Sequence, residues 1–292
     1  MQHEDYPALF LAADDASNNY QSFFLRLIRG EYITLVLAAV FSMSFLHGVG
    51  YYLVYASIFF IGLVILLTRA LSKPEQIWYG CRALAESVKT LTWRYMMHAT
   101  PFEGGGVGGE QQARSEFRNQ LHAVFDANRE VAKKITSEWP TKEQISTAMD
   151  RVRAMNRDDR MKYYLSNRVD DQRGWYARKA GMNKHSAFVW VCVSCSAYIL
   201  AGGMTLSRIA WPNWPYWPIE PLIVIAASVV GWMQIKKFNE LTAAYTVAAH
   251  EIGLIRPMAH DATNDDKFSD FVNDAEKAFS REHTLWIARQ SD

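Results

Sequence analysis

The sequence predicts an all-α membrane protein, in which four transmembrane helices form two hairpins and long cytosolic helical extensions form a bundle. Charged residues are absent from three long runs, 33–68, 186–207 and 221–235. A helix of about 20 apolar residues crosses the hydrocarbon layer of a membrane. Elsewhere glycine and proline are sparse, and apolar residues recur at helical spacing. The net charge of +1 and the mean hydropathy of -0.13 therefore average two unlike parts of the chain.

The first hairpin is predicted at residues 33–68, after an N-terminal cytosolic segment, 1–32. This segment holds acidic residues where a signal peptide needs basic ones, so we expect no cleaved leader. The uncharged run is long enough for two spans. The sequence His-Gly-Val-Gly at 47–50 favours a turn, which divides the run into spans of about 33–46 and 51–67.

The second hairpin is predicted at residues 186–235, with spans at 186–206 and 219–235. The loop between them, 211–218, holds three tryptophans and one tyrosine. These rings favour the headgroup layer, because one end is apolar and the other forms a hydrogen bond. Lysine and arginine flank the opposite ends of all four spans, whereas the two hairpin turns hold only Arg208. By the positive-inside rule, both termini and the middle of the chain are cytoplasmic.

Two cytosolic helical regions, 69–185 and 236–292, follow the hairpins. Both contain apolar residues spaced by four, three and four positions: Leu84, Val88, Leu91 and Tyr95 in the first region, and Leu241, Tyr245, Ala248 and Ile252 in the second. A seven-residue repeat buries one helix face against a partner, either within the chain or in an oligomer. Because hairpin and repeat occur twice, the sequence indicates an internal duplication.

Prolines and glycines predict where these helices run on and where they stop. No proline occurs from Arg157 to Ser207, so the third span is predicted to continue a cytosolic helix. The fourth span is likewise predicted to continue as far as Pro257. The glycine-rich stretch 100–109 lacks the Gly-Lys-Ser/Thr sequence of a phosphate-binding loop and is predicted to link two cytosolic helices.

The sequence holds no pattern that indicates catalysis. Its eight histidines are isolated, and no zinc-binding spacing or nucleophile motif occurs. We therefore expect no enzyme activity, no cofactor and no metal. Cys81, Cys192 and Cys195 are expected to be packing residues in a reducing compartment. The spans lack Asp, Glu, Lys and Arg, which argues against ion-coupled transport but leaves a pore open.

Two sets of residues are candidates for function. On one face of the third span, a row of small or polar residues could line a pore or pack against another helix: Cys195, Tyr198, Gly202 and Thr205. Just before that span, cations alternate with aromatic residues and could bind a nucleotide or anchor the chain at the membrane: Arg168, Arg173, Arg178 and Lys179.

The segment before the second hairpin, Tyr164–Gln172 with Trp175, Tyr176, Lys179 and Ala180, carries a family resemblance. It resembles the SLATT family of bacterial two-transmembrane effectors, which are associated with SMODS and SLOG nucleotide-signalling genes. Further similarity follows each hairpin, at Arg82–Lys89 and Leu241–Tyr245, and continues at Phe279–His283. From about Ser22 to Arg289, the chain is similar to two such units in tandem.

This resemblance implies a homo-oligomeric pore or ion channel in the bacterial inner membrane, for which we expect an assembly such as a tetramer. It implies that a nucleotide or short oligonucleotide, made by a partner nucleotidyltransferase, controls the pore, and that opening stops growth or kills the cell during phage infection. The similar effectors of Hailong antiphage systems are held shut by a DNA oligomer. The alternative is a non-conducting membrane anchor or scaffold that recruits a cytosolic partner.

Overall fold

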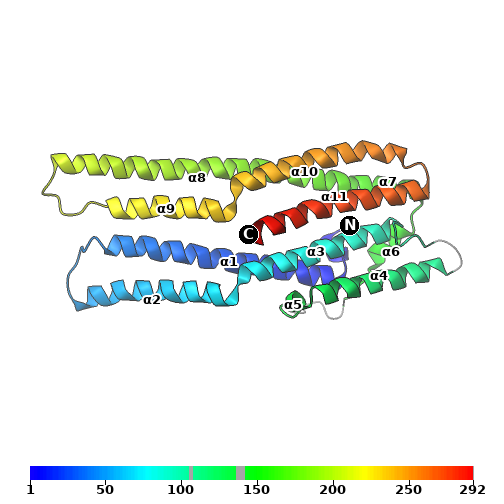
Figure 1. Cartoon of the computed structure of the whole chain (residues 1–292), viewed down its shortest axis with the longest axis horizontal. Helices are drawn as coiled ribbons and strands as arrows, with labels where there is room; N and C mark the ends of the chain where they lie inside the picture. Colours follow the sequence, from blue (N-terminus) through cyan, green and yellow to red (C-terminus); the bar gives the residue numbers. More distant parts are fainter. Residues whose placement is uncertain (105–107, 136–141, 292) are drawn as a thin grey trace. The chain divides into compact units, whose positions relative to one another are not determined.

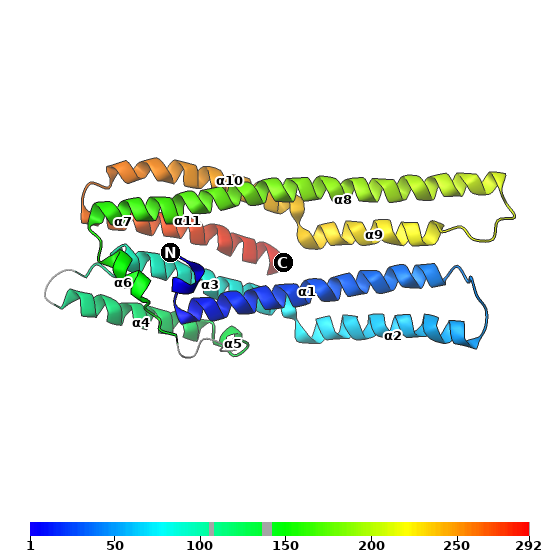
Figure 2. The same ribbon diagram turned by 180° about the vertical axis from the view of Figure 1, so that it is seen from behind.

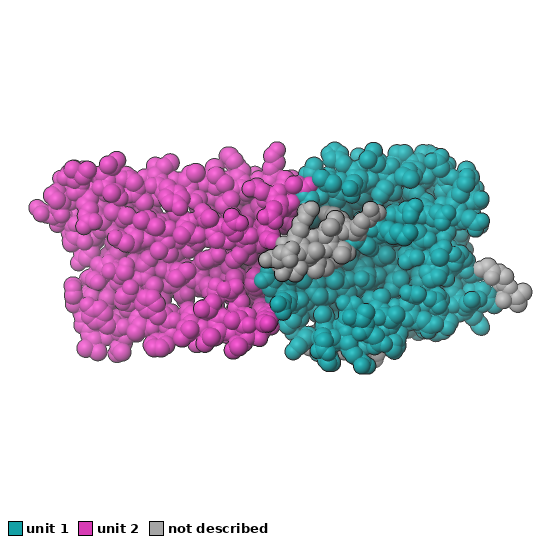
Figure 3. Space-filling model, viewed as in Figure 1, with its two compact units in different colours: residues 1–21, 75–178, 244–292 teal, residues 22–74, 179–243 magenta. Residues whose placement is uncertain are grey.

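The computed structural model describes residues 1–104, 108–135 and 142–291. Over these residues the chain forms helices and connecting loops without a β-strand, which confirms the all-α fold class. The chain divides into two compact units (Figure 3). Unit 1 comprises residues 1–21, 75–178 and 244–292, and unit 2 comprises residues 22–74 and 179–243.

Unit 2 consists of two helical hairpins. The first joins the later part of α1 (Ala8–Phe41) to α2 (Val49–Ser72), and the second joins the later part of α8 (Asp171–Ala210) to α9 (Ile219–Lys236). Figures 1 and 2 both show α2 beside α1 and α9 beside α8. Two helical hairpins are therefore present, and their helix ends differ from those expected.

Much of the apolar surface of unit 2 is exposed. Within the described residues, three helical runs are long and apolar enough to cross a membrane: Val49–Met96, Arg157–Ala210 and Ile219–Asp261. The most apolar part of the first run lies in α2. Only 6% of the residues in that part are buried. Water-soluble proteins rarely expose continuous apolar surface, so these helices are compatible with a membrane protein.

Helix α1 is shorter at its apolar end than the first predicted span of about 33–46. It ends at Phe41, where the Tyr51 hydroxyl donates a hydrogen bond to the Phe41 carbonyl. The following turn contains Ser44 and Gly48 in positive-φ conformations, which a helix cannot continue through. Its charge-free helical part, from Tyr32 onward, extends about 15 Å, roughly half the hydrocarbon thickness. Four spans are therefore not confirmed.

Unit 1 has one extensive buried core. Its longer helices, besides the starts of α1 and α8, are α3 (Pro74–Met96), α4 (Gly109–Ala127), α10 (Phe238–Met258) and α11 (Asp265–Ser291). Shorter elements complete it: η1 (His3–Asp5), α5 (Arg129–Ala132), α6 (Thr147–Arg153), α7 (Arg157–Tyr164) and η3 (Ala259–Asp261). Trp93, Tyr95, Tyr164 and Phe268 are among its largest fully buried side chains.

The predicted seven-residue repeats contribute to this core. Leu84, Val88, Leu91 and Tyr95 are all buried in α3. In the second repeat Ala248 and Ile252 are buried in α10, whereas Tyr245 and Leu241 are half-buried. These apolar helix faces could pack within the chain or in an oligomer, and the structure shows packing within the chain. The predicted boundaries between membrane and cytosolic segments, at residues 33, 69, 186 and 236, refer to a bilayer and stay predictions.

The third long helix is continuous, as predicted from the absence of proline. Residues Arg157–Ala210 stay helical throughout. Between α7 and α8 the run contains a π-helical turn, η2 (Leu165–Asp170). A π-helical turn holds an extra residue and changes which side chains face a neighbouring helix. Here the turn contains Arg168, whose side chain is buried.

The expected continuation of the fourth span to Pro257 is wrong, because the helix breaks at Lys237. Lys237 adopts a left-handed conformation with φ 47°, and its N–H donates to the Met233 carbonyl at 2.9 Å. Lys73, between α2 and α3, adopts the same conformation with φ 43°, and its N–H donates to the Arg69 carbonyl at 3.1 Å. Each hairpin thus ends at an equivalent lysine joint, which supports the duplication.

Candidate pore face and ligand-contacting residues

Helix α8 has one packed face and one exposed face in unit 2. Its buried residues there are small: Ala180, Ala187, Ser194, Ala197 and Ala201. Small side chains allow neighbouring helix backbones to approach closely. The predicted pore residues all lie on the exposed surface: Cys195, Tyr198, Gly202 and Thr205. The chain itself leaves these four positions uncovered, and their role in lining a pore stays a prediction.

Arg168, one of the cations proposed to bind a nucleotide, lies inside unit 1. Its Nε donates to Oε1 of Glu276 at 2.8 Å, and its Nη2 donates to Oε2 at 2.7 Å. The two side chains are 2% and 0% exposed. The ring of Phe279 lies 4.9 Å from the guanidinium carbon. Arg168 is therefore paired with a buried carboxylate and does not lie among the exposed cations.

Further hydrogen bonds hold Glu276 in place. Tyr164 donates its hydroxyl to Oε1 at 3.0 Å, and Thr90 donates to Oε2 at 3.1 Å. Burial alone would lower the pKa of Arg168, but attraction to Glu276 and hydrogen bonding with it raise the pKa. Burial and the nearby carboxylate also raise the pKa of Tyr164. Arg168 thus stays charged and Tyr164 stays a hydrogen-bond donor at neutral pH.

The other predicted cations are more accessible. Arg173 and Arg178 are exposed, and Lys179 is half-buried. The aromatic residues between them face α10, because Tyr245 contacts Trp175 and Tyr176 at 5.5 and 5.7 Å between ring centroids. These rings therefore hold α8 against α10 within unit 1. The arginines stay on the surface, where a phosphate could reach them.

The described part of the glycine-rich stretch forms a tight turn around Arg153. As predicted, the stretch connects two helices, α3 and α4. Arg153 donates to the carboxylate of Glu110 at 2.8 Å and to the carbonyls of Phe102, at 2.8 Å, and Tyr95. Gly104 has φ +65°, and a Cβ there would lie 2.7 Å from Nη2 of Arg153. Gly105–Val107 lie outside the described residues.

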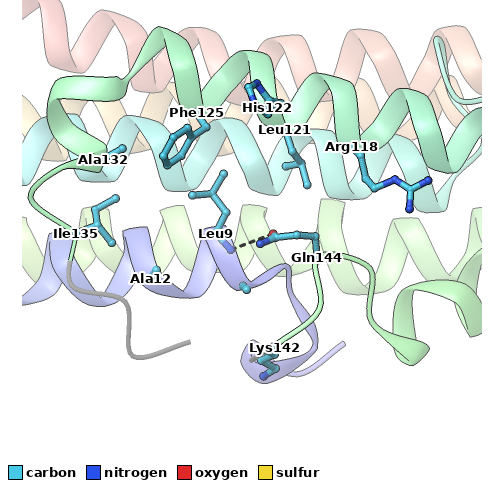
Figure 4. A pocket seen from close by; sticks show the side chains of 11 residues that line it. Leu9, Ala12, Arg118, Leu121, His122, Phe125, Ala132, Ile135, Lys142 and Gln144 are labelled. Atoms are coloured by element: carbon cyan, nitrogen blue, oxygen red, sulfur yellow. Dashed lines mark hydrogen bonds between the residues drawn. The ribbon is translucent and has the colours of Figure 1, made fainter. Parts of the chain in front are cut away.

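An open cavity of about 520 Å³ lies in unit 1 between the start of α1, α4 and the segment after α5 (Figure 4). Leu9, Phe125 and Ile135 form much of its apolar wall. Gln144 accepts a hydrogen bond from the Leu9 N–H at 3.2 Å, and His122 lies 2.9 Å from Asp126. None of the residues predicted to bind a nucleotide or line a pore borders this cavity.

Metal-binding and cysteine chemistry receive no support from the described residues. Among them, no group of three or more His, Cys, Asp or Glu side chains could hold a metal ion. Burial raises the pKa of the Cys81 thiol to about 11, so this residue is an unreactive packing group, as expected. Cys192 and Cys195 are exposed free thiols. The absence of enzyme activity stays a prediction.

Two family models match the chain. Residues 7–161 match the SMODS and SLOG-associating 2TM effector domain 3, and residues 164–286 match the SMODS and SLOG-associating 2TM effector domain 1. The matches follow one another and meet near the end of α7, which supports the duplication. Neither a curated protein nor a solved structure matches the chain.

Proposed function

The chain belongs to the SLATT family of two-transmembrane effector domains, and from this premise we propose that it forms a pore in bacterial antiphage defence. Copies of the chain assemble in the inner membrane as a homo-oligomer such as a tetramer, with both termini in the cytoplasm. A nucleotide or oligonucleotide, the product of a partner nucleotidyltransferase, gates the pore. Opening depolarises the membrane and causes growth arrest or cell death.

One observation carries this proposal: α8 exposes a row of uncharged small and polar positions beside the face that packs within the chain. Small and polar side chains can line a water-filled pore without a charged residue inside the membrane. Two hairpins are too thin to enclose a channel, so several copies must contribute. For the fourth span we propose α1, because each family domain is described as two-transmembrane. Its arginines, Arg26 and Arg29, can extend toward the headgroups.

Thiol accessibility at Cys195 tests the pore face. We expect a charged methanethiosulfonate to reduce the ion current of the reconstituted chain by at least about half, because an ion attached there obstructs the path. Cys192 is the matched control, since it lies roughly 60° around the same helix. Current in the Cys192→Ser variant should stay sensitive to the reagent, whereas current in Cys195→Ser should become insensitive.

Two results would contradict this assignment. Equal block of Cys195→Ser and the unchanged chain would mean that Cys195 does not face the conducting water. A chain that passes no ions under any nucleotide condition would rule out the pore itself. In that case the non-conducting scaffold would be favoured, and capture of a cytosolic partner by unit 1 would be the next measurement.

Nucleotide control is proposed to act through the exposed cations Arg173 and Arg178, with Lys179 beside them. Charge-assisted hydrogen bonds from such groups bind phosphate oxygens. We expect the double variant Arg173→Glu and Arg178→Glu to weaken nucleotide binding at least about tenfold, because reversed charges repel phosphate. Arg168 is left unchanged, since its replacement would disrupt the core.

The control for this variant carries the same charge change elsewhere on unit 1. Arg129→Glu with Arg151→Glu reverses two other exposed arginines. Calorimetric titration with the signalling nucleotide should show full affinity in this control, and the oligomer size of both variants should match that of the unchanged chain. Equal affinity in the two variants would remove Arg173 and Arg178 from the proposed site.

A further inference from the structure

Three basic side chains converge in unit 2 where the hairpin helices meet. They come from three helices: Arg29 from α1, Lys179 from α8 and Lys236 from α9. The charges that act most strongly on the Lys236 ammonium are those of Arg29 and Lys179, and both repel it. The repulsion between Arg29 and Lys236 is unfavourable unless an anion balances it.

The indole of Trp232 lies within this cluster. The Arg29 guanidinium carbon is 5.3 Å from the Trp232 ring centroid, and the Lys236 nitrogen is 5.8 Å from it. Both distances are within the range of cation–π attraction. The Trp232 Nε1 atom is buried, yet it donates to no acceptor among the described residues. An unsatisfied buried donor is rare, so its position beside the Arg29 and Lys236 cations points to an anionic acceptor.

The surrounding contacts fix this geometry. A Cβ on Gly231 would lie 2.5 Å from the Tyr32 hydroxyl, so this glycine allows α1 and α9 to approach closely. The approach brings Arg29, one turn before Tyr32, to the Trp232 indole. Glu31, the acidic residue nearest to Arg29 in the chain, is held by Arg69 at 2.7 Å. Its carboxylate is thus already engaged by another cation.

We propose that Arg29, Lys236 and Trp232 form a binding site for a phosphate group. Phosphate oxygens accept bidentate hydrogen bonds from arginine, attract lysine ammonium groups and can accept the indole N–H. The phosphate can come from an anionic phospholipid, whose acyl chains would cover the exposed apolar helices of the same unit, or from a soluble nucleotide. Binding at this site does not depend on whether the chain conducts ions.

The experiment compares phosphate sources on the full chain in nanodiscs. One arm uses phosphatidylcholine mixed with phosphatidylglycerol, and native mass spectrometry measures the phosphatidylglycerol retained by the released protein. The other arm uses phosphatidylcholine alone, with inorganic phosphate and adenosine monophosphate titrated by calorimetry. Retention of phosphatidylglycerol assigns the site to lipid, and saturable binding of a soluble phosphate assigns it to that source.

The test variant is Arg29→Gln with Lys236→Gln, and we expect it to lose at least about tenfold in phosphate binding. Arg26→Gln with Lys184→Gln is the matched control, because both residues are exposed cations of the same unit. The control should bind as the unchanged chain does. Arg29→Lys with Lys236→Arg, which keeps both charges, should retain most of the binding.

Two further outcomes decide the proposal. If the test variant fails to fold, Trp232→Phe replaces it, because this change removes the indole N–H and keeps an aromatic ring. That variant is expected to lose about tenfold in binding. Equal binding by test and control variants, equal losses in both, or absence of binding in both arms would overturn the site.

Discussion

Replacement of Glu276 by alanine is expected to lower the free energy of unfolding of unit 1 by about 3–5 kcal/mol. The change leaves the Arg168 charge buried without its carboxylate, and it removes the acceptor for Tyr164 and Thr90. Arg168→Ala should have a similar effect, because it leaves Glu276 as an uncompensated buried charge. Urea unfolding followed by circular dichroism in detergent would measure both changes.

An exposed ion pair in the same unit provides the control. Arg256 and Asp170 form a similar two-bond pair, at 2.6 and 3.2 Å, but their side chains are 44% and 41% exposed. Arg256→Ala should therefore change stability by less than about 1 kcal/mol. The double variant Arg168→Met with Glu276→Leu should lose much less than the two single losses together, because no charge stays unpaired. Additive losses would show that the buried pair is not energetically coupled.

Replacement of Arg153 by alanine is expected to destabilise unit 1 by about 3–5 kcal/mol. Its buried guanidinium donates hydrogen bonds to the carbonyls of Tyr95 and Phe102, and the substitution would remove both. It also lies 4.5 Å from the Tyr95 ring, so the substitution leaves a cavity. Thermal unfolding should show the loss, together with greater proteolytic sensitivity between α3 and α4.

Two comparisons separate the hydrogen bonds of Arg153 from its charge. Arg153→Lys keeps the charge but lacks the planar arrangement of donors, so we expect it to recover less than half of the lost stability. Arg114→Ala removes a nearby arginine whose pair with Asp150 is partly exposed, and it should lose less than about 1 kcal/mol. Full recovery by lysine would show that charge alone, without directed hydrogen bonds, stabilises the turn.

The sequence was sufficient to predict the all-helical class and the buried face of α3. Leu84 and Val88 could be assigned to a seam because the seven-residue spacing is a local signal. Partners distant in the chain leave no such signal. Arg168 stands in a row of cations and aromatic residues that suggests a phosphate site, whereas Glu276, 108 positions later, makes it a core residue. A cluster of cations in the sequence does not show which of them is paired with a carboxylate from a distant part of the chain.

The ends of the helices were harder to predict than their existence. The absence of charge continues past Phe41, but the helix ends there because backbone conformation and the Tyr51 hydrogen bond terminate it. Lysine does not favour the left-handed backbone conformation, so the sequence at Lys237 did not predict a break in the helix. A break at Lys73 was partly predictable, because Pro74 disfavours the helical conformation in the residue before it.

The lysine joints make the two helices of each repeat differ in backbone continuity. Lys73 and Lys237 interrupt one helix of each repeat, and non-glycine residues in their conformation store roughly 1–2 kcal/mol of strain. The partner helices, α1 and the run from α7 through α8, contain no residue in this left-handed conformation. Each repeat therefore pairs one continuous helix with one that is divided at a single strained residue.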